Sequence, residues 1–344
     1  MKSSIFFSLV LLTILSNISC ATSRFKTNDA QTNESYYQLY KLNSHINGLS
    51  LALHHHSSRH QIPKGTILLL HGSSFPSKLS FAFKMGGVSW IDQLTSAGFN
   101  VYSLDFLGYG GSDRYPEMIQ RNKNANPLGR GAEITADVNI AVEYILAKEK
   151  ISQIDLLGHS WGGAVAAKFS ETHSKKVNSL VMYAGITSVI PTKTSMPVEI
   201  PAYSTMTSKE RVESLNSLAP ESKRPLLASE LFTSWGDEWL RSDPIKSDDL
   251  TIDFPAGPKA DVHDFFNGQS FYDATKIESK VLIIRGEYDQ YPSDKHALQL
   301  YNNLVNAKLK RYVEIEEGTH VLHLEKNRHK LYESVIEFLI MPTP

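Results

Sequence analysis

The sequence has 344 residues, of which 41% are hydrophobic and 21% are charged, and its formal net charge is -1. This composition is typical of a globular protein with enough chain to build a sizeable core. A net charge so close to zero gives no electrostatic reason to expect a nucleic acid or an anionic surface as the partner.

The first twenty residues resemble an export signal. Lys2 is followed by an apolar run over 5–15, which is too short to span a bilayer as a helix. Cys20, the only cysteine, lies where the signal should end, and its position resembles the lipidated cysteine of a bacterial lipoprotein. That resemblance implies a membrane-anchored envelope protein that Cys20→Ser would move to the soluble fraction. Ordinary cleavage after Ala21, in a small-x-small pattern with Ser19, would instead give a soluble periplasmic or secreted protein.

After a polar tether over 21–34, predicted strands and helices alternate along the chain. Strands are expected over 36–42, 49–55, 66–71, 99–104, 151–157, 179–183, 281–285 and 309–315. Helices are expected over 90–97, 133–148, 163–169 and 324–340. Such alternation predicts an α/β fold with a mostly parallel sheet and right-handed crossovers.

The segment 186–272 interrupts this alternation. Buried-strand runs stop there, and helical pieces rich in Leu and Trp are expected over 208–218 and 226–240. We interpret the segment as a helical cap inserted into a core formed by 35–185 and 273–344. Its many aromatic residues favour a packed lid, because a solvated loop would not hold so many.

A G-x-S-x-G pattern lies between a predicted strand and a predicted helix. Gly158 and Gly162 flank Ser160 at a distance of two residues on each side. Glycines relieve the crowding of a sharp strand-to-helix turn, and such a turn presents the serine hydroxyl above the sheet. The pattern therefore predicts nucleophilic acyl chemistry at Ser160.

Three further motifs appear in a consistent order. They are a strand ending in His71-Gly72-Ser73-Ser74, a glycine turn that begins at Asp105, and a final pair of segments ending in Asp289 and His320. Together with the serine turn, they resemble the α/β-hydrolase fold family over about residues 36–344. The resemblance implies a mostly parallel central sheet flanked by helices, with a helical cap.

The resemblance also implies roles for individual residues. His320 would take the proton of Ser160, and Asp289 would orient the imidazole of His320. The backbone N–H groups of Ser73 and Trp161 would form the oxyanion hole. The chain order Ser, Asp, His is that of this family.

Other histidines compete for the role of base. His323 follows His320 by three residues, but the Gly-Thr-His context favours His320. We interpret His71 as structural and His159 as a neighbour of the nucleophile without a role in proton transfer. The run 54–56 is three consecutive histidines, which we interpret as surface residues because adjacent strand residues point to opposite faces.

Other acids compete with Asp289. Glu287 follows the same strand, but the family's spacing favours Asp289. Asp261 and Asp264, in the expected cap, are weaker candidates.

The favoured function is hydrolysis of a small or medium carboxylic ester through a Ser-His-Asp triad and an acyl-enzyme. Phe75 and Tyr109 are expected to form part of the substrate wall. We expect neither a metal nor another cofactor, since the sequence has neither Cys/His ligand spacing nor a glycine-rich phosphate loop.

Two alternatives remain open at this stage. An aminopeptidase similar to proline iminopeptidases would need cap acids to hold the free amine of its substrate, and the candidates are Glu210, Glu213, Glu230 and Glu238. A catalytically inactive binding protein anchored to the envelope is the other alternative, because fold alone does not establish function.

Overall fold

The computed structural model describes residues 36–191, 198–245 and 249–342. The expected signal sequence, the tether and Cys20 lie outside these residues, so lipidation and export stay predictions. Within the described ranges, no helix is long and apolar enough to cross a membrane.

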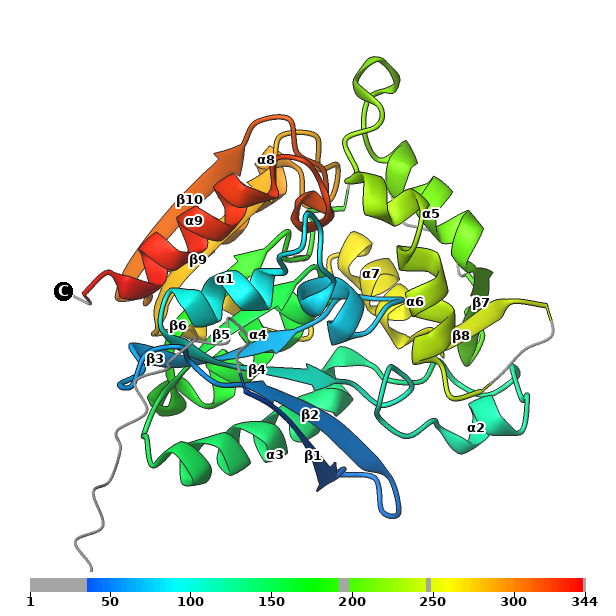
Figure 1. Ribbon diagram of the computed structural model, residues 1–344, viewed down its shortest axis with the longest axis horizontal. Helices are drawn as coiled ribbons and strands as arrows, with labels where there is room; N and C mark the ends of the chain where they lie inside the picture. Colours follow the sequence, from blue (N-terminus) through cyan, green and yellow to red (C-terminus); the bar gives the residue numbers. More distant parts are fainter. Residues whose placement is uncertain (1–35, 192–197, 246–248, 343–344) are drawn as a thin grey trace, which may run out of the picture. The chain divides into compact units, whose positions relative to one another are not determined.

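An eight-stranded sheet forms the centre of the fold (Figure 1). Its strands, in spatial order, are β1 (Tyr37–Asn43), β2 (Ser50–His56), β4 (Phe99–Asp105), β3 (Gly65–Leu70), β5 (Ile154–His159), β6 (Val177–Tyr183), β9 (Lys280–Gly286) and β10 (Leu309–Ile315). β2 is antiparallel to both of its neighbours, and the other pairs are parallel. The prediction of a mostly parallel sheet is confirmed.

The two faces of the sheet pack into separate hydrophobic cores. Along β3, Leu68 and Leu70 belong to one core, whereas Ile67 and Leu69 belong to the other. All four side chains are fully buried. This is the period-two alternation of a strand that is covered on both sides, which explains why the strand reads as one continuous apolar run.

Helices cover both faces. α1 (Trp90–Ser96) and α9 (Arg328–Ile340) supply side chains to the core that contains Ile67. α3 (Gly131–Glu149), α4 (Trp161–Thr172) and α8 (Asp294–Asn303) supply side chains to the other core. A short α2 (Pro116–Ile119) follows the glycine turn after β4.

The segment between β6 and β9 holds a group of further elements at one end of the sheet (Figure 1). They are β7 (Tyr203–Thr207), α5 (Ser208–Ser217), α6 (Trp235–Ser242), β8 (Thr251–Pro255) and α7 (Gly257–Phe266). We call this group the cap.

The cap differs from the expected helical insertion in two respects. β7 and β8 pair as an antiparallel ribbon, and β7 is mostly half-exposed and polar, so it lacks the apolar run of a buried strand. The helix expected over 226–240 is replaced by a 3₁₀ turn at Ser229–Phe232 followed by α6.

Candidate active site

Ser160 occupies the sharp turn between β5 and α4. Its φ of 55° and ψ of -122° lie in a region that L-residues rarely adopt. A Cβ atom at Gly158 would lie 2.3 Å from the carbonyl oxygen of Gly162, and a Cβ at Gly162 would lie 2.3 Å from the carbonyl oxygen of His71. The turn can therefore form only with glycines at these two positions, as the motif predicts.

Three side chains from distant parts of the chain form one hydrogen-bonded row. Ser160 Oγ lies 2.7 Å from His320 Nε2, and His320 Nδ1 lies 3.0 and 3.1 Å from the two carboxylate oxygens of Asp289. Because Asp289 accepts at Nδ1, the network assigns the proton of the neutral ring to Nδ1. Nε2 is then free to accept the hydrogen bond that the Ser160 hydroxyl donates.

The competing acids have other partners. Glu287 accepts a hydrogen bond from the backbone N–H of Glu317, at 2.9 Å. Asp261 and Asp264 bind Arg130. Asp289 is buried and also accepts from the N–H of Tyr291 at 3.0 Å, which fixes its carboxylate toward His320.

The other histidines of this region have partners other than Ser160. His159 Nε2 lies 3.0 Å from the carbonyl oxygen of His320, and the ring of His159 stacks on Tyr183. His323 Nδ1 lies 3.0 Å from the hydroxyl of Tyr183. Burial lowers the pKa of His159 well below its usual value and that of His323 to about 3, so both rings are neutral at physiological pH.

His71 holds the loop that follows β3. Its Nε2 accepts from the backbone N–H of Phe106 at 3.2 Å, so its Nδ1 carries the proton and donates to the carbonyl oxygen of Gly72 at 2.7 Å. Burial lowers the pKa of His71 to about 4.

Glu325 is a buried acid near this site that the sequence analysis did not single out. It accepts hydrogen bonds from the backbone N–H of Thr319, at 3.0 Å, and from the Thr319 hydroxyl. Burial raises the pKa of Glu325 to about 7. Thr319 directly precedes His320, so Glu325 helps to fix the loop that carries His320. No local motif marks Glu325 in the sequence.

The two expected oxyanion donors come from different parts of the chain: Ser73 lines the same cavity as Ser160, and Trp161 directly follows Ser160. Trp161 is the first residue of α4, where backbone N–H groups lack partners within the helix. Neither the N–H of Trp161 nor that of Ser73 donates to a backbone carbonyl elsewhere in the described chain. The indole N–H of Trp161 donates to Asp261 of α7 at 2.8 Å, which ties the cap to the start of α4.

A small cavity of about 150 Å³ opens onto Ser160 and His320. The core contributes Ser73 and Phe75 to its wall, and the cap helix α5 contributes Arg211 and Leu215, among others. Phe75 therefore lies where the sequence analysis expects a substrate wall.

Tyr109, the other expected wall residue, does not line this cavity. Its ring is buried against His71, with centroids 4.8 Å apart. The tight turn that contains Gly108 and Gly110, both at positive φ, directs this ring into the core.

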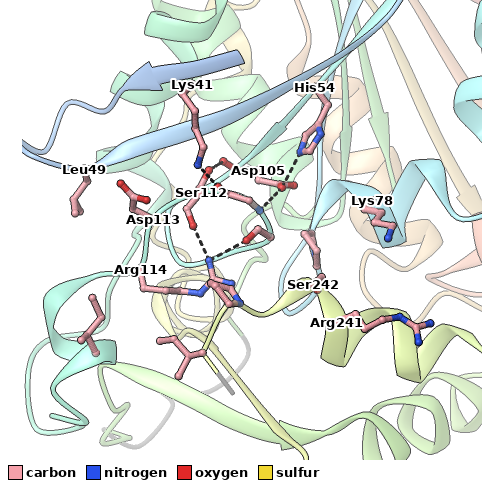
Figure 2. Close-up of a pocket in the computed structure, with 16 residues that line it drawn as sticks. Lys41, Leu49, His54, Lys78, Asp105, Ser112, Asp113, Arg114, Arg241 and Ser242 are labelled. Carbon is pink, nitrogen blue, oxygen red and sulfur yellow. Dashed lines mark hydrogen bonds and ion pairs between the residues drawn. The ribbon is translucent and has the colours of Figure 1, made fainter. Parts of the chain in front are cut away.

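A larger cavity of about 800 Å³ lies elsewhere, around the glycine turn, and none of the three hydrogen-bonded residues lines it (Figure 2). Asp105 lies there within hydrogen-bonding distance of His54 Nε2, at 3.0 Å, and accepts from the backbone N–H of Ser77 and Gly111. Burial alone would raise the pKa of Asp105, but the neighbouring His54 and the hydrogen bonds hold it well below its usual value. Asp105 thus holds the turn together.

The three consecutive histidines are not all on the surface. His55 is buried and stacks on Tyr102, with ring centroids 4.1 Å apart. The expectation of a surface position is wrong for His55, because β2 is an interior strand of the sheet and this face of it is covered.

Comparisons with known proteins agree with this architecture. A family model described as the alpha/beta hydrolase fold matches residues 65–327. A protein of Pseudomonas putida named 2-hydroxy-6-oxononadienedioate/2-hydroxy-6-oxononatrienedioate hydrolase 1 is 26% identical over 252 residues, which cover 72% of this chain and 79% of that protein. A protein of Escherichia coli O139:H28 with the corresponding name is 29% identical over 141 residues, or 39% of this chain and 41% of that protein.

Solved structures share the fold. A hydrolase from Pseudomonas aeruginosa PA01 superimposes with a TM-score of 0.60 at 17% identity, covering 88% of this chain and 98% of that one. An esterase from Exiguobacterium antarcticum gives a TM-score of 0.58 at 18% identity, covering 88% of this chain and all of that one. At such identities the likeness establishes the fold alone.

Proposed function

The chain belongs to the α/β-hydrolase fold family, and we propose that it is a serine hydrolase that cleaves carboxylic esters. The observation that carries the proposal is the row Ser160–His320–Asp289, with distances of 2.7 Å and 3.0 Å between successive side chains. A serine hydroxyl is a weak nucleophile unless an oriented base accepts its proton, and this row supplies such a base.

The proposed reaction has two halves. His320 Nε2 takes the proton of Ser160 as Oγ attacks the ester carbonyl, and Asp289 stabilises the imidazolium that forms. The N–H groups of Ser73 and Trp161 bind the oxyanion, and the protonated His320 gives its proton to the leaving alcohol. Water then attacks the acyl-enzyme with His320 again acting as base, and this releases the acid.

The aminopeptidase alternative has less support. None of the four candidate acids lines the cavity at Ser160. Glu210 caps α5, Glu213 pairs with Lys209, Glu230 accepts from the N–H of Gly86, and Glu238 pairs with Lys78. The charged cap side chain that lines the cavity is Arg211, a cation, which would repel the ammonium group of an aminopeptidase substrate.

The names of similar proteins support hydrolysis in general more than hydrolysis of esters. The Pseudomonas putida protein is named a hydrolase of a dioate, and one of the solved structures is named an esterase. The inactive-protein alternative has no positive support in the described site, because nucleophile, base and acid lie within hydrogen-bonding distance of one another.

The test is hydrolysis of a panel of short-chain esters and aminoacyl amides by the wild type and Ser160→Ala. We expect the wild type to cleave esters, and Ser160→Ala to lose on the order of 10⁶-fold in kcat, as in a comparable triad. Ser170→Ala is the control, since Ser170 lies on α4 and its hydroxyl donates to the carbonyl oxygen of Ala166 within the same helix. Near-wild-type activity in Ser160→Ala would exclude the proposal, and faster cleavage of the amides would favour the aminopeptidase.

A further inference from the structure

Arg211 is a cation beside the proposed nucleophile, and none of the described carboxylates pairs with it. It lies on α5 and lines the same cavity as Ser160 and His320. Its Nε atom is buried and has no hydrogen-bond partner among the described residues. In the described part of the chain it forms no ion pair, whereas the buried Arg114 and Arg285 each pair with an acid, and the half-buried Arg328 donates to the backbone carbonyls of Glu325 and Met85.

The acids on the same helix cannot serve as its partner. Glu210 is engaged in the capping box at Thr207, and Glu213 is exposed and lies 4.0 Å from Lys209. The Arg211 guanidinium instead lies over the ring of Phe75, with its central carbon 5.4 Å from the ring centroid. A cation–π contact of this kind offsets only part of the cost of removing a guanidinium from water.

The guanidinium nevertheless stays charged. Burial lowers the pKa of Arg211 to about 10, which is still far above neutral pH. The Arg211 side chain is half-buried and its buried Nε lacks a partner among the described residues, so a ligand that supplies the opposite charge would be bound favourably there. The position of Arg211 in the cavity of Ser160 makes the substrate the ligand that can do so.

The rest of the wall constrains the substrate further. Leu215, Leu218 and Val321 line the cavity together with Arg211, and the whole space is only about 150 Å³. An acyl chain bound to Ser160 would therefore run a short distance along apolar side chains before it reaches the guanidinium. The planar, forked guanidinium matches the two oxygens of a carboxylate.

We propose that Arg211 binds a carboxylate of the substrate, so that the enzyme acts on short esters that carry a free acid group, such as monoesters of dicarboxylic acids. This inference deepens the proposed function and rests on it. For monomethyl glutarate, water would cleave the ester bond to give glutarate and methanol with release of one proton. The cap would thus select for charge as well as for size.

A binding experiment tests the site without turnover. Monomethyl glutarate and methyl pentanoate, which lacks the acid group, are titrated by calorimetry into Ser160→Ala protein and into the same protein with Arg211→Met added. We expect the acid to bind more tightly than the neutral ester, and Arg211→Met to weaken binding of the acid about tenfold to hundredfold, as for loss of a charge-assisted hydrogen bond. Lys209→Met is the matched control, because it removes a positive charge from the exposed side of α5 and should leave the affinity unchanged.

Equal affinity for the two compounds, or an unchanged affinity in Arg211→Met, would overturn the inference.

A second experiment uses the wild type alone. The value of kcat/KM should be highest for monomethyl glutarate, lower for methyl pentanoate and lowest for methyl 5-(trimethylammonio)pentanoate. A preference for the neutral or the cationic ester would likewise overturn the carboxylate site. If no ester is cleaved although the acid binds through Arg211, the proposed hydrolysis fails and the anion site stands.

Discussion

Ser160, the proposed nucleophile, is one of the residues that this fold holds in a strained backbone conformation. Ser160 adopts a positive φ that serine rarely adopts, and the glycines at 158 and 162 permit the surrounding chain to approach within van der Waals distance. Hydrogen bonds on both sides keep the turn in place, because Ser160 donates its N–H to Tyr183 and accepts at its carbonyl from Gly163. The strain thus presents the hydroxyl toward His320.

Asp289→Asn tests the assignment of the acid. An amide at this position can present its N–H₂ group to Nδ1 and so favour the wrong tautomer of His320, which costs about 10⁴-fold in kcat in a comparable triad. Steady-state kinetics on the best ester of the panel measures the loss.

Glu287→Gln is the matched control for this substitution, since Glu287 follows the same strand but bonds the N–H of Glu317. We expect Glu287→Gln to keep activity within a few-fold of the wild type. A large loss in Glu287→Gln with little loss in Asp289→Asn would show that Glu287, and not Asp289, is the acid of the triad.

Individual residues differed in how far the sequence could predict them. Ser160 and His320 stand in short motifs whose geometry is local, and the structure brings both together with Asp289. Arg211 and Glu325 stand in no motif. Their surroundings come from segments far away in the chain, such as the loop at Phe75 for Arg211, and periodicity does not reveal such contacts.

At the scale of elements, one buried carboxylate joins the cap to the core. Asp261 of α7 accepts from the backbone N–H of Gly131 at 2.7 Å, from the Trp161 indole at 2.8 Å and from Arg130 Nε at 2.5 Å. These donors lie at the starts of α3 and α4. Asp261 therefore fixes the helix start that supplies one proposed oxyanion donor.

Asp261→Ala should lower the free energy of unfolding by about 3 kcal/mol, because three donors lose a buried acceptor at once. Urea denaturation monitored by tryptophan fluorescence measures the change. Asp264→Ala is the control: Asp264 also binds Arg130, but its side chain is 33% exposed, so its loss should cost less than about 1 kcal/mol. Equal losses in the two variants would show that Asp261 has no special place in joining cap and core.

The sequence predicted the elements of the core better than those of the cap. Strands such as β3 and β9 are buried on both faces, so their sequences are nearly continuous apolar runs. β7 and β8 pair only with each other, and 43 residues separate the end of β7 from the start of β8. A ribbon whose first strand is mostly half-exposed, and whose two strands lie so far apart in the chain, leaves little local pattern in the sequence.

For the molecule as a whole, Glu325 links stability to pH. Its pKa is about 7 in the fold and 4.5 in the reference state, so the native state binds more protons between these values. The stabilising contribution of the protonated form is complete below pH 4.5 and is lost as pH rises through 7. The free energy of unfolding of the wild type relative to Glu325→Gln should therefore fall over this window, by on the order of 3 kcal/mol.

Urea denaturation of both proteins at several pH values from 4 to 8 measures this difference. Glu337→Gln, an exposed position on α9, is the control and should follow the wild type at every pH. A difference between wild type and Glu325→Gln that stays constant or grows as pH rises would contradict the buried, protonated state of Glu325.

The most direct test of the proposed function is labelling of the folded protein with a fluorophosphonate, followed by intact mass and peptide mapping. This reagent reacts with a serine that has both a base and an oxyanion hole, so it reports on Ser160, His320 and the N–H donors together. We predict a single adduct on Ser160 in the wild type and no adduct in Ser160→Ala. A folded wild-type protein that forms no adduct, or forms one on another serine, would contradict the account of this site.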